Sequence, residues 1–169
     1  LDGDVERTKN RPIPGKKLSI FERWAVFVVL SLFSLMLLSV TNTNTIFISI
    51  CFGLMVVLYP LTQRFFIGPQ IFLGLTFNPT IIVYAMTNEL NNPTMIFLYL
   101  AIAAKTIAFD PFYGLCDIKD DKKLGINSTP LWWGSKTLLV IAILQFAVIS
   151  LFFIVGLKAE LSFAWYIGI

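Results

Sequence analysis

Histidine is absent from this sequence, and cysteine occurs only twice, at Cys51 and Cys116. Without histidine the chain cannot form a His-based catalytic triad, and two cysteines without metal-ligand spacing leave no zinc site. A glycine-rich phosphate loop of the Walker type is also missing, and no serine–aspartate set indicates an acyl-enzyme. These absences exclude several large classes of soluble enzyme.

Charge is scarce as well. Charged residues make up 14% of the chain against 57% hydrophobic residues, and the mean hydropathy is +0.79. A water-soluble domain cannot hide so much apolar surface, so the solvent for most of the chain is predicted to be membrane lipid. The net charge of +3 is carried by residues that flank apolar runs, which indicates membrane topology and no nucleic-acid partner.

The apolar residues form five runs of the length that a membrane-spanning helix needs. The runs are Trp24–Val40, Ile46–Leu61, Ile71–Thr87, Thr94–Phe109 and Leu138–Leu157, and a sixth begins at Leu161. They lack the polar alternation of a membrane β-barrel, and a helix satisfies its own backbone in lipid. We therefore predict an all-α, polytopic transmembrane helical bundle, with residues 1–169 in a single membrane-embedded domain.

Both ends of the sequence are expected to be truncated. Leu1 is not a start methionine, and the last apolar run, Leu161–Ile169, would cover only about 14 Å as a helix, at ~1.5 Å per residue. The hydrocarbon core is ~30 Å thick, so this run cannot cross it. We expect the bundle to continue on both sides.

Lysine and arginine are unevenly divided among the loops. Residues 1–23, 62–70 and 110–137 hold eleven of them, whereas the intervening loops hold one and Lys105 lies inside a span. By the positive-inside rule the three basic segments share one side of the membrane. That side is the cytoplasm if the protein lies in a bacterial inner membrane, or the matrix if it is in the mitochondrial inner membrane.

Carboxylates follow the same sidedness, and two of them have metal-binding spacing. Asp117 and Asp121 share one face if their segment is helical, with roughly 5 to 6 Å between Cβ atoms. Such a pair needs a positive partner, and Mg²⁺ binds carboxylates together with substrate phosphates. The alternative interpretation is an ordinary solvated loop of mixed charge, which spacing alone favours.

Several cations could bind an anionic substrate. A basic string that includes Arg7, Lys9 and Arg11 follows Asp2, and its side chains suit phosphate oxygens. The same residues could instead serve topology and contacts with anionic lipids. Lys105 and Arg64 lie within or beside spans, where ionisable groups are functional candidates, although for Lys105 snorkelling to the interface is favoured.

At this point three stretches resemble a known family, the UbiA prenyltransferases. Asp110–Thr129 (DPFYGLCDIKDDKKLGINST) resembles the second aspartate-rich motif of that family, in the form typical of its 4-hydroxybenzoate branch. The stretch from Asp2 to Pro14 resembles the tail of the first motif, with Asp2 as its last aspartate. Tyr59–Phe65 (YPLTQRF) with Pro69–Gln70 is similar to the loop that the family places between the two motifs.

The resemblance implies transfer of a polyprenyl group from its diphosphate to the ring of 4-hydroxybenzoate, on the way to ubiquinone. It implies that Mg²⁺ is held by Asp2, Asp117 and Asp121, the residues central to catalysis. It further implies that four cations contact the diphosphate and that Arg64 binds the aromatic substrate through the carboxylate of that substrate. The diphosphate-binding candidates are Arg7, Lys9, Arg11 and Lys123.

Departures from the family pattern keep other interpretations open. Lys119 stands where relatives often carry an acidic residue, Pro111 directly follows Asp110, and Phe77–Pro79 replaces a smaller, glycine-containing stretch. The acceptor could instead be a haem or a naphthoate. A membrane transporter is the alternative of a different class, but transport sites usually lie near the bilayer midplane on broken helices.

Overall fold

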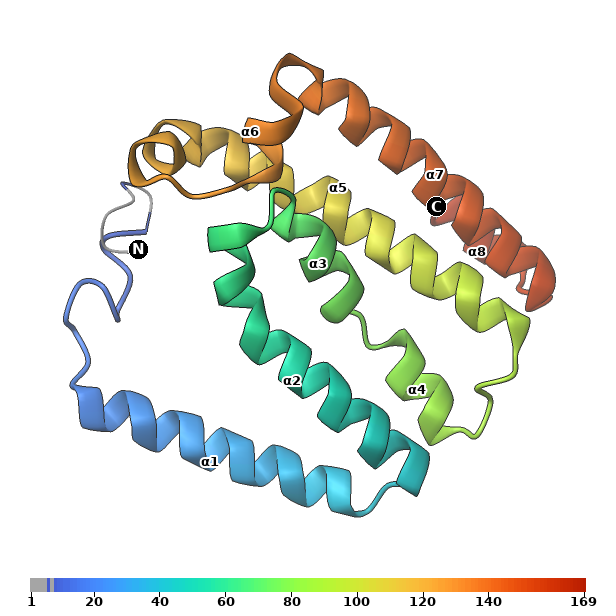
Figure 1. The fold of residues 1–169 in the computed structure, drawn as a ribbon. Helices are drawn as coiled ribbons and strands as arrows, with labels where there is room; N and C mark the ends of the chain where they lie inside the picture. Colours follow the sequence, from blue (N-terminus) through green and yellow to red (C-terminus); the bar gives the residue numbers. More distant parts are fainter. Residues whose placement is uncertain (1–5, 7) are drawn as a thin grey trace.

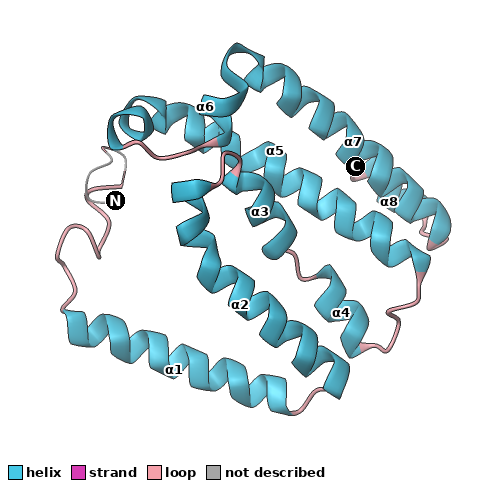
Figure 2. Cartoon of the chain, viewed as in Figure 1, coloured by secondary structure: helices cyan, strands magenta, loops and turns pink. Residues whose placement is uncertain are grey.

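The computed structural model describes residue 6 and residues 8–169, and every regular element in this part of the chain is helical (Figures 1 and 2). The elements run in the order α1 Ile20–Ser39, α2 Thr43–Phe65, α3 Pro69–Thr76, α4 Thr80–Met86, α5 Pro93–Leu124, α6 Thr129–Trp133, a 3-10 turn Gly134–Lys136, α7 Thr137–Lys158 and α8 Phe163–Ile167. The predicted all-helical fold is confirmed.

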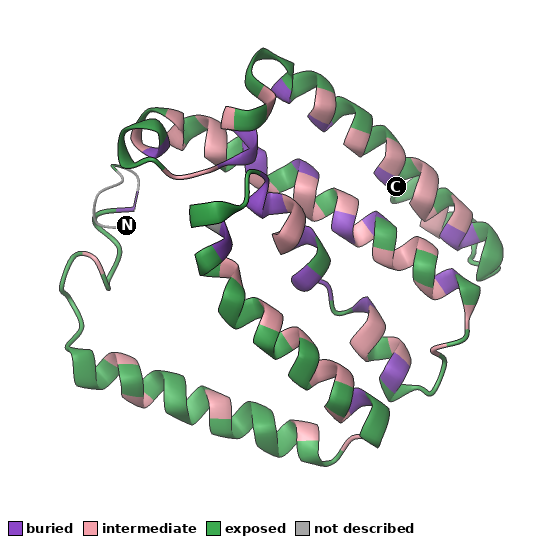
Figure 3. Ribbon diagram, viewed as in Figure 1, coloured by how far each residue is buried: buried purple, intermediate pink, exposed green. Residues whose placement is uncertain are grey.

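Four helices are long and apolar enough to cross a membrane, which fits an integral membrane protein. They are α1, α2, α5 and α7, and they correspond to four of the five predicted spans. These helices carry many exposed Leu, Ile, Val and Phe residues, and exposed positions are green along the ribbon in Figure 3. Exposure of so many large apolar side chains is the expected state of a surface that faces lipid rather than water.

Helix α1 begins at a complete capping box. The Ser19 hydroxyl accepts from the Glu22 backbone N–H at 3.2 Å, and Glu22 accepts from the Ser19 N–H at 2.7 Å. No residue of α1 is buried, and the helix stands apart from the others for most of its length (Figures 1 and 3). Its stability in this arrangement comes from backbone hydrogen bonds and lipid rather than from protein packing.

The predicted span Ile71–Thr87 is wrong as a single helix. It is divided into α3 and α4 by residues 77–79, because Pro79 lacks the N–H that would continue the α3 ladder. Neighbouring side chains satisfy the freed backbone. The buried Asn78 donates to the Tyr99 carbonyl at 2.8 Å and accepts from the Thr80 N–H at 3.2 Å, while the Tyr99 hydroxyl donates to the Leu75 carbonyl at 2.7 Å.

Helix α5 is the longest element, and it overturns a second expectation. The segment from residue 110 was counted among the loops, although the Asp117–Asp121 pairing required it to be helical. It is helical up to Leu124 and ends at Gly125, whose φ of 64° is left-handed. Thirty-two residues cover about 48 Å, at ~1.5 Å per residue, against ~30 Å of hydrocarbon. The last turns of α5 therefore extend past the apolar layer and carry the carboxylates with them.

Helix α5 packs most extensively against α7, with α3 against its other side (Figure 1). Small residues line these contacts: Ala101, Ala103 and Ala108 are buried on α5. In lipid, small residues hold helices together because they let the backbones approach closely. Gly74 of α3 is the tightest such point, since a Cβ built on it would lie 2.5 Å from Ile107 Cγ1 and 2.8 Å from the Ala103 carbonyl oxygen.

We expect Gly74→Ala to lower the free energy of unfolding in detergent by about 1–3 kcal/mol, because the added methyl meets a backbone oxygen that cannot move aside. The matched control is Gly53→Ala, where a Cβ meets nothing within 4 Å. That control should be neutral or slightly stabilising, because alanine favours a helix over glycine. Thermal unfolding of both variants checks the prediction, and equal stability of the two would contradict the close α3–α5 contact.

Candidate active site

The three basic segments of the sequence lie at one end of the helices. Residues that lead into α1, the α2–α3 connection, and the end of α5 with α6 all gather there, whereas the α1–α2, α4–α5 and α7–α8 connections lie at the opposite end (Figure 1). The described residues of these segments are therefore close enough to form one site, while their common side of the membrane stays a prediction. Hydrogen bonds at this end join residues 59 and 114 positions apart in the sequence.

Asp117 and Asp121 occupy neighbouring turns near the end of α5, as their spacing predicts. Asp121 is buried and Asp117 is partly exposed. Two carboxylates suit Mg²⁺, which commonly uses one or two of them and takes its other ligands from phosphate and water. Within the described part of the chain no group of three or more metal-ligating side chains gathers, so α5 supplies a partial set.

Asp120 connects this site to the start of the chain. The backbone N–H of Glu6 donates to Asp120 Oδ2 at 3.1 Å, and Lys123 Nζ lies 3.9 Å from Asp120 Oδ1. Glu6 in turn pairs with Lys9 at 2.6 Å. Both of these predicted diphosphate-binding cations therefore have acidic partners here, but exposed ion pairs contribute only about 0–1 kcal/mol and exchange readily for a phosphate.

The remaining predicted site residues near the N-terminus divide into two groups. Asp2 and Arg7 lie outside the described residues. Arg11 is exposed within a series of turns, where its N–H donates to the Thr8 carbonyl at 3.0 Å and its own carbonyl accepts from the Gly15 N–H at 2.8 Å. These bonds order the backbone around Arg11 as turns, without a regular helix.

Gln70 holds the segment that follows the aspartates, and sequence reasoning gave it no role. Its Oε1 accepts from the Thr129 N–H at 2.8 Å and also from the Thr129 hydroxyl, and both residues are buried. The first turn of α3 is thereby attached to the first turn of α6. The only sequence signal was that both residues belong to the stretches that resemble the family, because nothing local predicts a contact across 59 positions.

Arg64 lies exposed in the last turn of α2, at the end of the helices where the α5 carboxylates lie (Figure 1). A cation is favourable there because it faces the negative end of the helix dipole. Its guanidinium can present a planar fork to a carboxylate. The role of Arg64 in binding the aromatic substrate, which the resemblance implied, stays a prediction.

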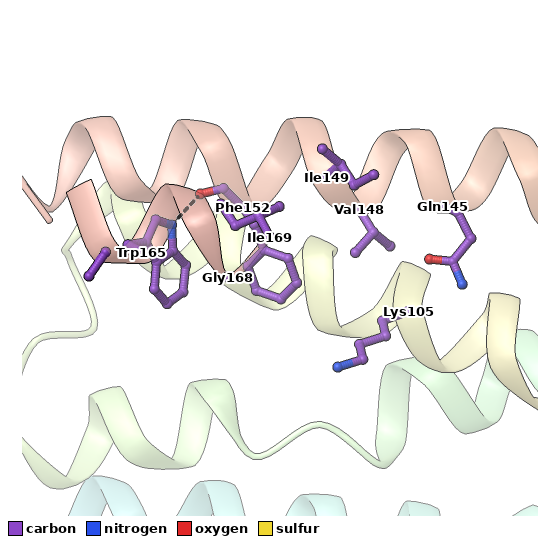
Figure 4. Close-up of a pocket in the computed structure, with 9 residues that line it drawn as sticks. Lys105, Gln145, Val148, Ile149, Phe152, Trp165, Gly168 and Ile169 are labelled. Carbon is purple, nitrogen blue, oxygen red and sulfur yellow. Dashed lines mark hydrogen bonds between the residues drawn. The ribbon is translucent and has the colours of Figure 1, made fainter. Parts of the chain in front are cut away.

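Lys105 belongs to a different place. It is exposed on α5 and borders a cavity of about 540 Å³ between α5, α7 and α8 (Figure 4). The other lining residues are Gln145, Val148, Ile149, Phe152, Ala164, Trp165, Gly168 and Ile169. Lys105 precedes Asp117 by twelve residues, which is about 18 Å along a helix. It is therefore too distant to contact a phosphate held by the aspartates.

A match over residues 1–169 assigns this sequence to a described protein family, the UbiA prenyltransferase family. The chain belongs to this UbiA family. The resemblance carried by the two aspartate-rich stretches is thus confirmed along the whole chain. Prenyl transfer, rather than transport, is the chemistry that this family is named for, so the transporter alternative loses its basis.

Individual UbiA relatives give the same assignment. The relative in Marinomonas sp. (strain MWYL1) is 37% identical over 171 residues, a match that covers 100% of this chain and 60% of that protein. The relatives in Alcanivorax borkumensis and Pseudomonas aeruginosa are 39% and 35% identical, and the match covers 100% of this chain and 59% and 57% of those proteins. All three are named 4-hydroxybenzoate octaprenyltransferase.

This UbiA chain therefore spans about 60% of the length of the relatives it matches. No solved structure matches it significantly.

The helix break between α3 and α4 also bears on the transporter alternative. Broken helices near the midplane often mark ion or substrate sites in transporters. Here the break borders a cavity of about 390 Å³ whose lining residues include no charged side chain. The Asn78 amide is already engaged with the Thr80 N–H at the start of α4 and with the Tyr99 carbonyl of α5. The break therefore has the features of a helix interruption that serves packing of the bundle, and lacks those of an ion or substrate site.

Proposed function

We propose that the protein transfers a polyprenyl group from polyprenyl diphosphate to the ring carbon ortho to the hydroxyl of 4-hydroxybenzoate, a step toward ubiquinone. The observation that carries the proposal is the Asp117–Asp121 pair at the end of α5, in a chain of the UbiA family. The names of the relatives support the aromatic acceptor and the polyprenyl donor. Residues 1–169 would be part of one membrane-embedded prenyltransferase domain.

In this reaction the bond between the allylic carbon and the diphosphate oxygen breaks, and a carbon–carbon bond to the ring forms. Diphosphate leaves with the electron pair of the broken bond, and after the carbon–carbon bond has formed the substituted ring carbon gives its proton to a base, which restores the aromatic ring. Members of the family generally depend on a divalent metal. Mg²⁺ would supply Lewis acidity to the leaving diphosphate, and Asp117, Asp121 and Asp2 are the residues that would hold it.

The chain's own cations would offset the rest of the diphosphate charge. Lys123 lies two residues after Asp121, and Lys9 lies within the segment that contacts Asp120 through Glu6. Arg11 follows on the same segment, and Arg7 is the fourth candidate. Cations that line a site where negative charge develops lower the barrier because they are already oriented before the reaction begins.

The membrane setting suits the electrophile. An allylic cation reacts with water at once, so its formation needs a site from which water is excluded. The end of α5 lies where the apolar part of that helix gives way to its charged turns. A diphosphate bound there stays in reach of the aqueous phase, and the isoprenoid tail can extend among the apolar helices and the lipid.

Arg64 would bind the carboxylate of 4-hydroxybenzoate and so orient the ring with its ortho carbon toward the allylic carbon. The site would open to the cytoplasm in a bacterial inner membrane, or to the matrix in a mitochondrial one, because the basic segments gather at that end.

An assay of the full-length protein in membranes tests the proposal. The donor is a polyprenyl diphosphate, the acceptors are 4-hydroxybenzoate and a dihydroxynaphthoate, and Mg²⁺ is present or removed by chelation. We expect prenylated 4-hydroxybenzoate only with Mg²⁺. Prenylation of the naphthoate alone would transfer the protein to another branch of the family, and metal-independent product would remove the role proposed for the aspartates.

A further inference from the structure

The contact between the start of the chain and α5 involves one carboxylate that the proposed chemistry does not use. Asp120 Oδ2 accepts the Glu6 backbone N–H at 3.1 Å, across 114 positions of sequence. The Glu6 side chain does not take part in this bond; its Oε1 forms an ion pair with Lys9 Nζ at 2.6 Å. The bond to Asp120 thus depends on the main chain at position 6 and on one oxygen of the carboxylate.

Both carboxylate oxygens of Asp120 have partners within the chain. One faces a backbone N–H, and the other faces the Lys123 ammonium at 3.9 Å. Its side chain is 24% exposed, and it lies one residue from Asp121 and three from Asp117, at the edge of the pair that suits Mg²⁺. This carboxylate is placed to bind the chain rather than a metal.

The consequence of this attachment follows from chain length. Asp2 precedes Glu6 by four residues, and four extended residues reach at most about 14 Å. The segment after Glu6 is fixed as well, because Thr8 is buried and residues 8–17 form consecutive hydrogen-bonded turns. Holding position 6 on α5 therefore limits how far any group just before it can lie from Asp117 and Asp121, which raises the effective concentration of that group at the site.

We propose that Asp120 is a positioning residue that fastens the segment carrying the first aspartate-rich motif beside the Asp117–Asp121 pair, by accepting the backbone N–H of residue 6. This inference rests on the proposed function, which it deepens by giving Asp117 and Asp121 the metal and Asp120 the assembly of the site. The role needs an acceptor oxygen at position 120 and does not need a negative charge.

Asparagine and alanine at position 120 distinguish a hydrogen-bond acceptor from a charged metal ligand, because asparagine keeps an acceptor oxygen and loses the charge, whereas alanine loses both. In the full-length protein we expect Asp120→Ala to raise the Mg²⁺ concentration needed for half-maximal activity about tenfold, the size of effect typical of residues that orient metal ligands. Asp120→Asn should stay within about threefold of the natural protein. Lys119→Ala, a change at an exposed neighbour, is the control for surface charge.

Equal loss of activity in Asp120→Asn and Asp120→Ala would show that the charge is needed and would overturn the proposal in favour of direct metal binding. Unchanged Mg²⁺ dependence in Asp120→Ala would overturn it too.

A cross-linking measurement tests the geometry without any activity. Cys116 is exposed and lies one helical turn before Asp120, on the same side of α5. With Cys51 and any cysteines outside residues 1–169 replaced by serine, Glu6→Cys leaves the backbone N–H in place. A short bismaleimide that spans ~10 Å should join positions 6 and 116 rapidly, more slowly in Asp120→Ala, and at the original rate in Asp120→Asn.

Absence of the cross-link with Asp120 intact, or a rate that Asp120→Ala leaves unchanged, would overturn the attachment whatever the enzyme does. If the cross-link followed this pattern in a protein without prenyltransferase activity, the attachment of residue 6 to Asp120 would be supported and the proposed function would be contradicted.

Discussion

Asp121→Asn and Asp117→Asn are each expected to lower Mg²⁺-dependent prenylation by about 100-fold or more, because each replaces a charged metal ligand with a neutral amide. Both side chains lie on the last turns of α5, beyond the apolar part of that helix, and contribute little to its membrane insertion. Expression and insertion should therefore be normal. The measurement is the initial rate of prenyl transfer across a range of Mg²⁺ concentrations.

The matched control for this pair is Glu89→Gln, the same carboxylate-to-amide change at an exposed position in the connection between α4 and α5, at the opposite end of the helices (Figure 1). It should leave the rate and the Mg²⁺ requirement unchanged. If both aspartate variants kept their activity, the metal assignment would fail, since α5 would then contribute no essential ligand.

The helical architecture could be read from the sequence where one physical rule decided the outcome. Long apolar runs without charge give spanning helices, and four of the five predicted runs are such helices. The rule failed for the run from Ile71 to Thr87, because hydropathy does not register the loss of a single backbone donor at Pro79. The break is tolerated because Asn78 accepts from the Thr80 N–H and the Tyr99 hydroxyl donates to the Leu75 carbonyl, and the second of these bonds depends on packing with α5.

The extension of α5 was missed for a related reason. Charged residues after Asp110 mark the end of the apolar run, and that boundary was taken as the end of the helix. Lysine and the other long side chains have good helix propensity, however, and the first left-handed residue after Asp110 is Gly125. Hydropathy sets the end of the apolar run, whereas helix propensity and the glycine cap set the end of the helix. Here the helix continues for fifteen residues past the apolar run, from Asp110 to Leu124.

The candidate site was predictable in part. Spacing of four residues placed Asp117 and Asp121 on one face, and charge counting placed the basic segments at one end. Neither rule could pair Gln70 with Thr129 or Glu6 with Asp120, because such contacts across 59 and 114 positions arise only when the helices pack. The residues that assemble a site therefore escape sequence reasoning more often than those that carry its charge.

Arg64→Ala is expected to raise the apparent KM for 4-hydroxybenzoate about tenfold to 100-fold, with a small change in the KM for the polyprenyl diphosphate. A hydrogen bond to a charged group contributes about 1.5–3 kcal/mol, and its loss should fall on the substrate that carries the carboxylate. The KM of Arg64→Lys for 4-hydroxybenzoate should lie between those of the natural protein and Arg64→Ala, since lysine keeps the charge and loses the planar fork. Steady-state kinetics with each substrate varied in turn checks the prediction.

The methyl ester of 4-hydroxybenzoate gives the sharper form of this test, because it removes the negative charge from the substrate while keeping the ring. If Arg64 binds the carboxylate, the natural protein should lose affinity for the ester, and Arg64→Ala should cause little further loss, as a double-mutant cycle requires for groups in contact. Arg23→Ala is the matched control, since Arg23 is bonded to the Leu18 carbonyl at the start of α1. An equal penalty of Arg64→Ala on acid and ester would place Arg64 away from the carboxylate, and an equal rise in both KM values would assign it to the diphosphate instead.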